Sequence, residues 1–257
     1  INPGINRWHG NKPYFWACAA LHAHLKPAVA MYKQILVLLG GFLLMFHLSA
    51  QTQTAYPGKR TLLPNGWSIT PAGRQIAIGD FPIAMTLSPD GALLAVAHAG
   101  VGLQYVQLFD AKTGAPLDSL TVNKLWYGLV FSADSKRLYA SAGTDNSVEV
   151  FRLANHKLVR DSVIRLGKPM KNNDVFAAGL ALDAVHNRLF ACTMGDSMLH
   201  VVNLKTQKVE QHIALPNEPY ACAYNAQTNE VYASLWGGKT VAVFDANTLR
   251  RKADLPA

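Results

Sequence analysis

Charged residues are scarce in this chain of 257 residues, and familiar catalytic signatures are missing from it. Only 16% of the residues are charged, whereas 50% are hydrophobic, so the chain has enough apolar residues to form a sizeable core. No HExxH, CxxCH or GxSxG pattern occurs, so the sequence carries no short-motif signature of a zinc peptidase, a c-type cytochrome or a serine hydrolase. The length suits a single large all-β domain.

The basic net charge of +8 does not form a nucleic-acid footprint. Residues 1–50 contain no acid, and their bases account for half of that charge: Arg7, Lys12, Lys26 and Lys33. The only tight basic run in the rest of the chain is 250–252, and no lysines or arginines alternate with aromatic residues. Because nucleic-acid binding needs a concentrated basic patch, we expect no nucleic-acid partner.

Cysteine and histidine offer little material for a metal or cofactor site. Of the three cysteines, Cys192 and Cys222 fall on different expected strands, so a disulfide would need their Cα atoms within about 7 Å. Buried free thiols are the favoured interpretation. Five histidines do not recur at equivalent positions, and none has a close partner at ligand spacing; they are His98, His156, His186, His200 and His212. We expect no metal and no cofactor.

The N-terminal residues have the pattern of an export signal. From Met31 the sequence reads MYKQILVLLGGFLLMFHLSAQTQT, in which Lys33 precedes an apolar run and Ser49-Ala50 offers a small-residue cleavage site. The sequence predicts a signal peptide at 31–50, with an uncleaved anchor as the alternative, and a linker at 51–60. Residues 1–30 are interpreted as a non-native extension that precedes the start. We expect an exported protein, periplasmic or extracellular, without a membrane span beyond the signal peptide.

One sequence pattern occurs four times between Pro82 and Ala257. When Ser88, Ser132, Asp183 and Asn225 are aligned, Leu94, Leu138, Leu189 and Val231 also align, as do Asp110, Arg152, Asn203 and Asp245. A period of about 40 to 50 residues with several short strands per unit is typical of a β-propeller blade. The predicted fold class is all-β, a β-propeller of four-stranded antiparallel blades.

The first repeat predicts four strands separated by turns. The expected strands are Ile83 to Leu87 (inner), Leu93 to His98, Tyr105 to Phe109 and Leu117 to Val122 (outer). Asp90 and Asp134 share a position that resembles a catalytic acid, but the repetition identifies it as a turn residue. Asp110, Asn203 and Asp245 are expected to accept hydrogen bonds within later turns, whereas the second copy relies on Asn155.

Small residues occupy equivalent points of the four inner strands: Ala84, Gly128, Gly179 and Ala221. Inner strands crowd around the axis of a propeller, so we interpret these positions as steric rather than catalytic. Each blade buries its faces only against its neighbours.

The segment before the repeats predicts a partial additional blade. Trp67 to Ile69 and Gln75 to Ile78 are expected to form two short outer strands whose inner partners come from elsewhere. No segment after Ala257 is present to pair with them, and an unpaired edge is a liability. We therefore expect residues 61–257 to be an incomplete propeller from a longer protein, with four to five blades here; a closed four-bladed ring is the alternative.

Several of these segments resemble a known repeat. LYASAGTDNSVEVFRL, VYASLWGGKTVAVFD and LLAVAHAGVGLQYVQLFD resemble the YVTN-type repeat of bacterial propellers. LPNGWSITPAGRQIAIGDFPIAMTLSPDG and LWYGLVFSADSKRLYASAGTDN are similar to the propeller half of secreted proteins that join such a propeller to an alkaline-phosphatase-superfamily phosphoesterase domain. The resemblance implies a seven-bladed ring followed by a metal-dependent hydrolase domain, whose ligands and nucleophile have no counterparts in this chain.

Four aromatic residues and one proline, in loops that enter the inner strands or join the middle ones, are the candidate ligand-binding residues at the channel mouth: Trp126, Tyr127, Pro219, Tyr220 and Trp236. They could stack on a sugar, peptide or cofactor ring, or pack between blades as structural residues. The long connection at 167–176 is a second candidate, or simply a solvated excursion.

Two functions of different classes remain. In the first, the propeller is a non-catalytic binding or scaffold module, partnered by its own C-terminal phosphoesterase domain and by a small molecule, glycan or protein. In the second, the propeller is itself an enzyme of the lactonase or quinone-dependent dehydrogenase type. An enzyme needs acids, histidines or arginines converging at one mouth. The small and apolar inner strands favour the first.

Overall fold

The computed structural model describes residues 61–69, 75–167 and 175–257. The chain divides into two compact units, Ile1–Gln75 and Ile76–Ala257, which are considered separately. The described residues form strands, turns and loops without a helix, so none of them belongs to a helix that could cross a membrane. The extension 1–30, the signal peptide 31–50 and the linker 51–60 lie outside the described residues.

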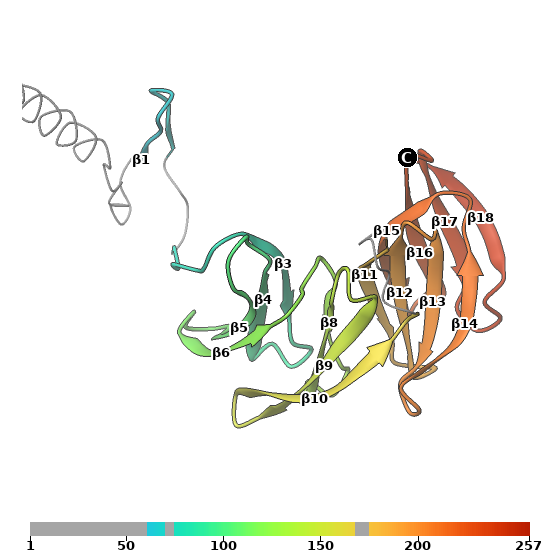
Figure 1. Ribbon diagram of the computed structural model, residues 1–257, viewed down its shortest axis with the longest axis horizontal. Coiled ribbons are helices and arrows are strands. Elements are labelled where there is room, and N and C mark those ends of the chain that lie inside the picture. Colours follow the sequence, from blue (N-terminus) through green and yellow to red (C-terminus); the bar gives the residue numbers. More distant parts are fainter. Residues whose placement is uncertain (1–60, 70–74, 168–174) are drawn as a thin grey trace, which may run out of the picture. The chain divides into compact units, whose positions relative to one another are not determined.

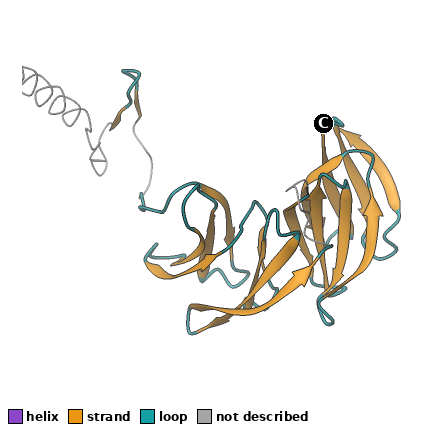
Figure 2. Ribbon diagram, in the orientation of Figure 1, coloured by secondary structure: helices purple, strands orange, loops and turns teal. Residues whose placement is uncertain are grey.

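The second unit consists of four antiparallel four-stranded sheets, each built from consecutive strands (Figure 1; Figure 2). This is the predicted all-β propeller architecture. The strands, from inner to outer in each successive blade, are β3 (Pro82–Leu87), β4 (Leu93–His98), β5 (Gln104–Asp110) and β6 (Pro116–Val122); β7 (Leu129–Phe131), β8 (Arg137–Ser141), β9 (Ser147–Ala154) and β10 (Lys157–Arg165); β11 (Phe176–Asp183), β12 (Arg188–Met194), β13 (Met198–Asn203) and β14 (Lys208–Ala214); β15 (Glu218–Asn225), β16 (Glu230–Trp236), β17 (Thr240–Asp245) and β18 (Arg251–Pro256). The strands expected in the first repeat match β3 to β6 within one residue at each end.

The core lies between blades. Three apolar clusters fill the spaces between blades 1 and 2, 2 and 3, and 3 and 4. Side chains alternate across β12, so that Leu189 belongs to the cluster with blade 2 and Phe190 to the cluster with blade 4. Both are fully buried. A blade therefore has no core of its own, and neighbouring blades stabilise each other by removing apolar surface from water.

The inner strands approach one another too closely for a side chain at two of the predicted small positions. A Cβ on Gly128 would lie 2.2 Å from the carbonyl oxygen of Ala178 on the next inner strand. A Cβ on Gly179 would lie 2.6 Å from the Cα of Ala221. The steric interpretation of the inner-strand glycines is confirmed, because both close contacts are with backbone atoms of the following blade.

The turn residues act as the sequence predicts. The Asp90 carboxylate accepts hydrogen bonds from the Ser88 hydroxyl (2.6 Å) and from the Ala92 amide (3.0 Å). Asp134 repeats this arrangement with Ser132 in blade 2. These bonds lower the pKa of both carboxylates, the serine hydroxyl contributing most. In the second copy Asn155 takes a positive φ of 51°, which asparagine tolerates, and makes the tight turn that the sequence assigned to it.

The expectation for the opening segment is wrong in part. Residues 75–78 form no strand. The first unit instead contains a two-stranded hairpin, in which β2 (Ser68–Ile69) pairs with β1 (Thr61–Leu62). The turn at Asn65-Gly66 explains the difference, because it brings the chain back onto its own preceding residues; Asn65 Oδ1 accepts the Trp67 amide at 3.1 Å. The strand predicted around Ser68 therefore has a local partner rather than a distant one.

Candidate functional site

Three of the predicted site residues come together at one end of the blades. Tyr127 precedes the inner strand of blade 2, Tyr220 lies near the start of the inner strand of blade 4, and Trp236 ends the second strand of blade 4. In the β15–β16 ladder Glu218 pairs with Trp236 and Pro219 with Leu235, so the start of one strand and the end of the next share this edge. We call Tyr127, Tyr220 and Trp236 the aromatic platform.

The rings of the platform form a continuous row. The ring centroids of Tyr127 and Tyr220 are 5.0 Å apart with their planes at 39°, and those of Tyr220 and Trp236 are 5.2 Å apart at 54°. These separations fall in the range of favourable tilted ring contacts. Trp236 remains 62% exposed and Tyr127 39% exposed. The platform thus presents aromatic surface to solvent while its members hold one another in position.

Gly179 explains how a blade 2 residue reaches a blade 4 residue. The inner strand of blade 3 runs between them, and the Cβ position of Gly179 is only 2.8 Å from the Tyr220 carbonyl oxygen. Without a side chain at this point, β15 closes onto β11, and Tyr220 approaches the edge of blade 2. Burial, and then the neighbouring Tyr127, raise the pKa of Tyr220.

The other two predicted residues do not join the platform. Trp126 is half-buried and turns toward Phe176, with ring centroids 6.0 Å apart. Its amide donates to the Ser141 carbonyl oxygen at 2.9 Å. Pro219 is buried within the β15–β16 ladder. Both residues are placed as packing elements, the structural alternative that the sequence left open for this group. Residues 168–174 of the long connection lie outside the described part of the chain.

Polar groups border the platform on blade 4. Glu218 is half-buried opposite Trp236, and Asn217 is exposed just before it. The Asn217 side-chain oxygen lies close to Gly238 in the following turn, at 2.6 Å from the position that a Cβ would occupy there. A carboxylate and an amide beside an aromatic row can accept and donate hydrogen bonds to hydroxyl groups of a bound molecule.

A polar chain in blade 3, buried at Thr193 and His200 and exposed at His212, was missed at the sequence level. His200 and His212 face each other across β13 and β14, with their Nδ1 atoms 2.8 Å apart, which corrects the expectation that no histidine has a close partner. His200 Nε2 lies 2.8 Å from Thr193 Oγ1, and that hydroxyl also bonds to Asp196. The available signal was the hairpin register, because residues 200 and 212 are equidistant from the turn at 205–207.

The carboxylate at one end fixes the direction of this chain. The Asp196 carboxylate accepts a hydrogen bond from the Thr193 hydroxyl, so Thr193 Oγ1 accepts one from His200 Nε2–H. His200 Nδ1 then accepts a hydrogen bond from His212 Nδ1–H. The last of these bonds requires a neutral His200, because its Nδ1 can accept only when it carries no proton. Burial, and then the nearby His212, lower the pKa of His200 from 6.5 to about 4. The Thr193–Asp196 end of the chain supports the β12–β13 turn from within the blade.

We expect the propeller unit to lose stability in acid through His200. The folded-state pKa lies below the unfolded value, so the unfolded chain binds the extra proton as pH falls from about 6.5 toward 4. The contribution is complete above pH 6.5, and about 2 kcal/mol should be lost by pH 4.5. Urea unfolding at pH 7 and 4.5 measures the loss, which His200→Gln should reduce. The exposed His156→Asn is the control, and equal pH dependence in all three proteins would contradict this assignment.

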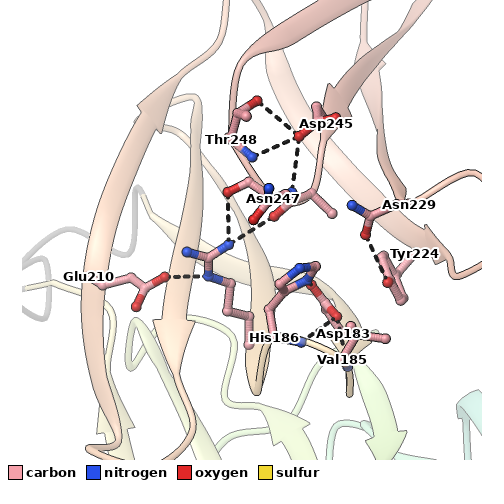
Figure 3. Close-up of polar contacts among 11 residues, drawn as sticks. Asp183, Val185, His186, Glu210, Tyr224, Asn229, Asp245, Asn247 and Thr248 are labelled. Carbon is pink, nitrogen blue, oxygen red and sulfur yellow. Dashed lines mark hydrogen bonds and ion pairs between the residues drawn. The ribbon is translucent and has the colours of Figure 1, made fainter.

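A second polar cluster joins blades 3 and 4 (Figure 3). The Asp183 carboxylate is fully buried and accepts the amides of Val185 and His186, both at 3.0 Å, as well as His186 Nδ1 at 2.6 Å. An aspartate–histidine pair can belong to a catalytic set, but here all three bonds lie within one turn. The pair therefore shapes the β11–β12 connection.

Arg188 connects this turn to the next blade. Its Nη1 donates to the Ala246 carbonyl oxygen at 2.8 Å, while its Nε pairs with Glu210 on the outer strand of its own blade (Figure 3). In the following turn Asp245 accepts the amides of Asn247 and Thr248. The Arg188–Ala246 bond therefore links blade 3 to blade 4, whereas the Asp245 bonds hold the turn that Arg188 contacts.

A polar groove of about 570 Å³ lies between blades 2 and 3. It is at the end of the blades opposite to the platform, because its lining comes from the turns that follow the inner strands; the polar lining residues include Asp134, Arg137, Tyr139, Asn187, Lys205 and Gln207. Arg137 is paired with Asp161 at 3.3 Å, and Asp134 bonds within its own turn. Within residues 61–69, 75–167 and 175–257, no group of three or more His, Cys, Asp or Glu side chains is placed to hold a metal ion.

Comparison with known proteins supports the propeller fold. No protein-family model and no curated protein matches the sequence. Among solved structures, the chain is similar to Kuenenia stuttgartiensis hydrazine synthase (TM-score 0.58, 16% identity, covering 72% of this chain and 52% of that one). It is also similar to the WD40 repeats of RRP9 (TM-score 0.56) and to U3-55K (TM-score 0.55). Each of these two matches has 12% identity and covers 69% of this chain and 52% of the other chain. The chain spans about half the length of these chains.

Proposed function

We propose that this chain is a non-catalytic ligand-binding propeller module whose binding surface is the aromatic platform. The observation that carries the proposal is the exposed row of Tyr127, Tyr220 and Trp236, contributed by two blades and held by ring contacts. Rings that serve only as packing are covered, whereas Trp236 leaves most of its surface in solvent. Exposed aromatic surface of this kind marks an interaction site.

The ligand class we favour is a neutral carbohydrate. Aromatic faces bind the apolar face of a sugar ring, and the flanking Glu218 and Asn217 supply hydrogen-bonding atoms for its hydroxyl groups. The row of three rings, spaced by 5.0 and 5.2 Å, offers successive contacts to a chain of sugars. A peptide would use backbone hydrogen bonds from a strand edge, which the platform does not present.

The alternative of an enzyme with its site at the channel needs several acids, histidines or arginines converging at one mouth. Glu218 pairs with Trp236 in the β15–β16 ladder, and the residues next to these two are Asn217, Gly237 and Gly238, which are neither acids nor bases. This composition favours binding over catalysis.

We further propose that the module is exported and belongs to a longer, seven-bladed YVTN-type protein with a C-terminal phosphoesterase domain. The resemblance of residues 61–257 to such propellers supports this, as does the signal-peptide pattern at 31–50. The matched part of this chain spans only about half of the solved propeller chains, which is consistent with additional blades. Phosphatase assays should find hydrolysis in the full-length gene product and none in residues 51–257; hydrolysis by the latter would reverse the assignment.

Truncating the platform should remove sugar binding. Titration with soluble neutral oligosaccharides, followed by tryptophan fluorescence, should show binding that Trp236→Ala or Tyr220→Ala weakens about tenfold or more, because a stacked ring contributes about 1–3 kcal/mol. Leu103, which is 77% exposed on blade 1, provides the control variant Leu103→Ala. Unchanged affinity in both platform variants, with the fold intact, would move the binding site elsewhere.

A further inference from the structure

Cys192 and Cys222 come from neighbouring blades and lie at the same close approach. Cys192 is on β12 opposite Ala178 and Gly179, where the register between β11 and β12 shifts. On blade 4, the backbone nitrogen of Cys222 is 2.9 Å from the position that a Cβ on Gly179 would take. The strands β12 and β15 that carry the two cysteines also contact each other. Gly179 therefore brings both cysteines to the same point of the interface.

The two thiols face the same apolar space. Cys222 Sγ points to the carbonyl oxygen of Phe190 on β12, at 3.7 Å, two residues before Cys192 along that strand. Both side chains belong to the apolar cluster between blades 3 and 4. Cys192 is fully buried and Cys222 is half-buried, and both are free thiols in this structure. A hydrogen bond with the Cys222 thiol, followed by burial, raises the pKa of Cys192 well above its ordinary value.

We propose that Cys192 and Cys222 form an oxidisable pair that closes into a disulfide between blades 3 and 4. An exported protein meets an oxidising environment, in which such pairs persist as disulfides. The link would join strands separated by about 30 residues of sequence, a loop long enough for a cross-link to restrict the unfolded chain. It would fasten the blade that carries Tyr220 and Trp236 to the blade before it.

The oxidant is a low-molecular-weight disulfide, and the order of steps follows from exposure. The more accessible Cys222 loses its proton and attacks one sulfur of the reagent, releasing one thiol molecule and leaving a mixed disulfide. Cys192 then loses its proton and attacks Cys222 Sγ, which releases the second thiol molecule. Both cysteine protons end on the two released thiols, and the electron pair passes from the protein dithiol to the reagent. The protonated, buried Cys192 makes the second step the slower one.

Oxidised glutathione is the probe, applied to the whole chain in a Cys18→Ser background so that only the two propeller cysteines can react. We expect both thiols to disappear together, the intact mass to fall by two hydrogens, and one proteolytic peptide pair to contain Cys192 joined to Cys222. The oxidised protein should unfold at a higher urea concentration than the reduced protein. Cys192→Ser should instead stop at a mixed disulfide on Cys222.

Other outcomes would overturn the proposal. If the chain with both cysteines accumulates only the mixed disulfide, or keeps both thiols under conditions in which Cys192→Ser reacts at Cys222, the two sulfurs do not meet. If neither the chain with both cysteines nor Cys192→Ser reacts in the folded state, the two thiols only pack in the core and are not an oxidisable pair. The comparison does not depend on the identity of the platform ligand or on the phosphoesterase connection.

Discussion

Replacing Gly179 by alanine should destabilise the propeller unit by about 3 kcal/mol, near the upper end of what overpacking costs. The new methyl group would lie 2.6 Å from the Cα of Ala221, 2.8 Å from the Tyr220 carbonyl oxygen and 2.9 Å from the Cys222 nitrogen. All three are backbone atoms of the next inner strand, so no side chain can rotate away. Strand β15 must therefore move away from β11, which disturbs the packing between blades 3 and 4. Urea unfolding of the variant measures the loss.

Matched glycines separate crowding from the general effect of replacing glycine. Gly128→Ala should also cost about 1–3 kcal/mol, because its Cβ would lie 2.2 Å from the Ala178 carbonyl oxygen. Gly102 has open space around its Cβ position and no positive φ, so Gly102→Ala should change stability little. Equal midpoints for Gly102→Ala and Gly179→Ala would show that the inner strands can separate without cost.

Replacing Asp183 by alanine should cost about 2–4 kcal/mol. The carboxylate is fully buried and accepts from two backbone amides and the His186 ring, so its removal leaves three groups of the β11–β12 turn without their partner. Hydrogen bonds to a charged group contribute more than neutral ones, and a buried group left unpaired loses its solvation as well. The change should appear in the urea midpoint and in faster amide exchange around the β11–β12 turn.

The equivalent residue of blade 4 is the natural control. Asn225 occupies the same repeat position, is half-buried, and accepts one amide hydrogen bond, from Gln227 at 2.9 Å. Asn225→Ala should therefore cost about 0.5–1.5 kcal/mol. If both variants lose the same stability, Asp183 is an ordinary turn residue, and its burial adds nothing to the bonds drawn from it in Figure 3.

Strand β15 contributes both to stability and to the proposed binding surface. Gly179 allows Tyr220 to approach Tyr127, and the same close approach places Cys222 beside β12. A change at this glycine is thus expected to disturb the platform as well as the core. Variants of Trp236, which is 62% exposed, should affect binding without this loss of stability.

The sequence by itself determined the blades. Repetition identified four copies of one unit, and alternation with turn residues located strands such as β4 (Leu93–His98) to the residue. The roles of Asp90 and Gly179 could also be predicted, because the turn acceptor recurs in the first two repeats and a small inner-strand residue recurs in all four. These features depend on neighbours within a blade, or on a constraint that recurs at each inner strand.

Only the tertiary structure decided which residues meet across blades or across a hairpin without repetition. The sequence grouped Trp126 with Tyr127, yet adjacent residues point to different sides, and only Tyr127 reaches Tyr220. It placed Cys192 and Cys222 in separate units and did not show that Gly179 brings them together. It missed the His200–His212 pair and gave Gln75 to Ile78 a strand that does not form. Such contacts depend on register and on how closely two backbones approach, which a single copy of a pattern does not encode.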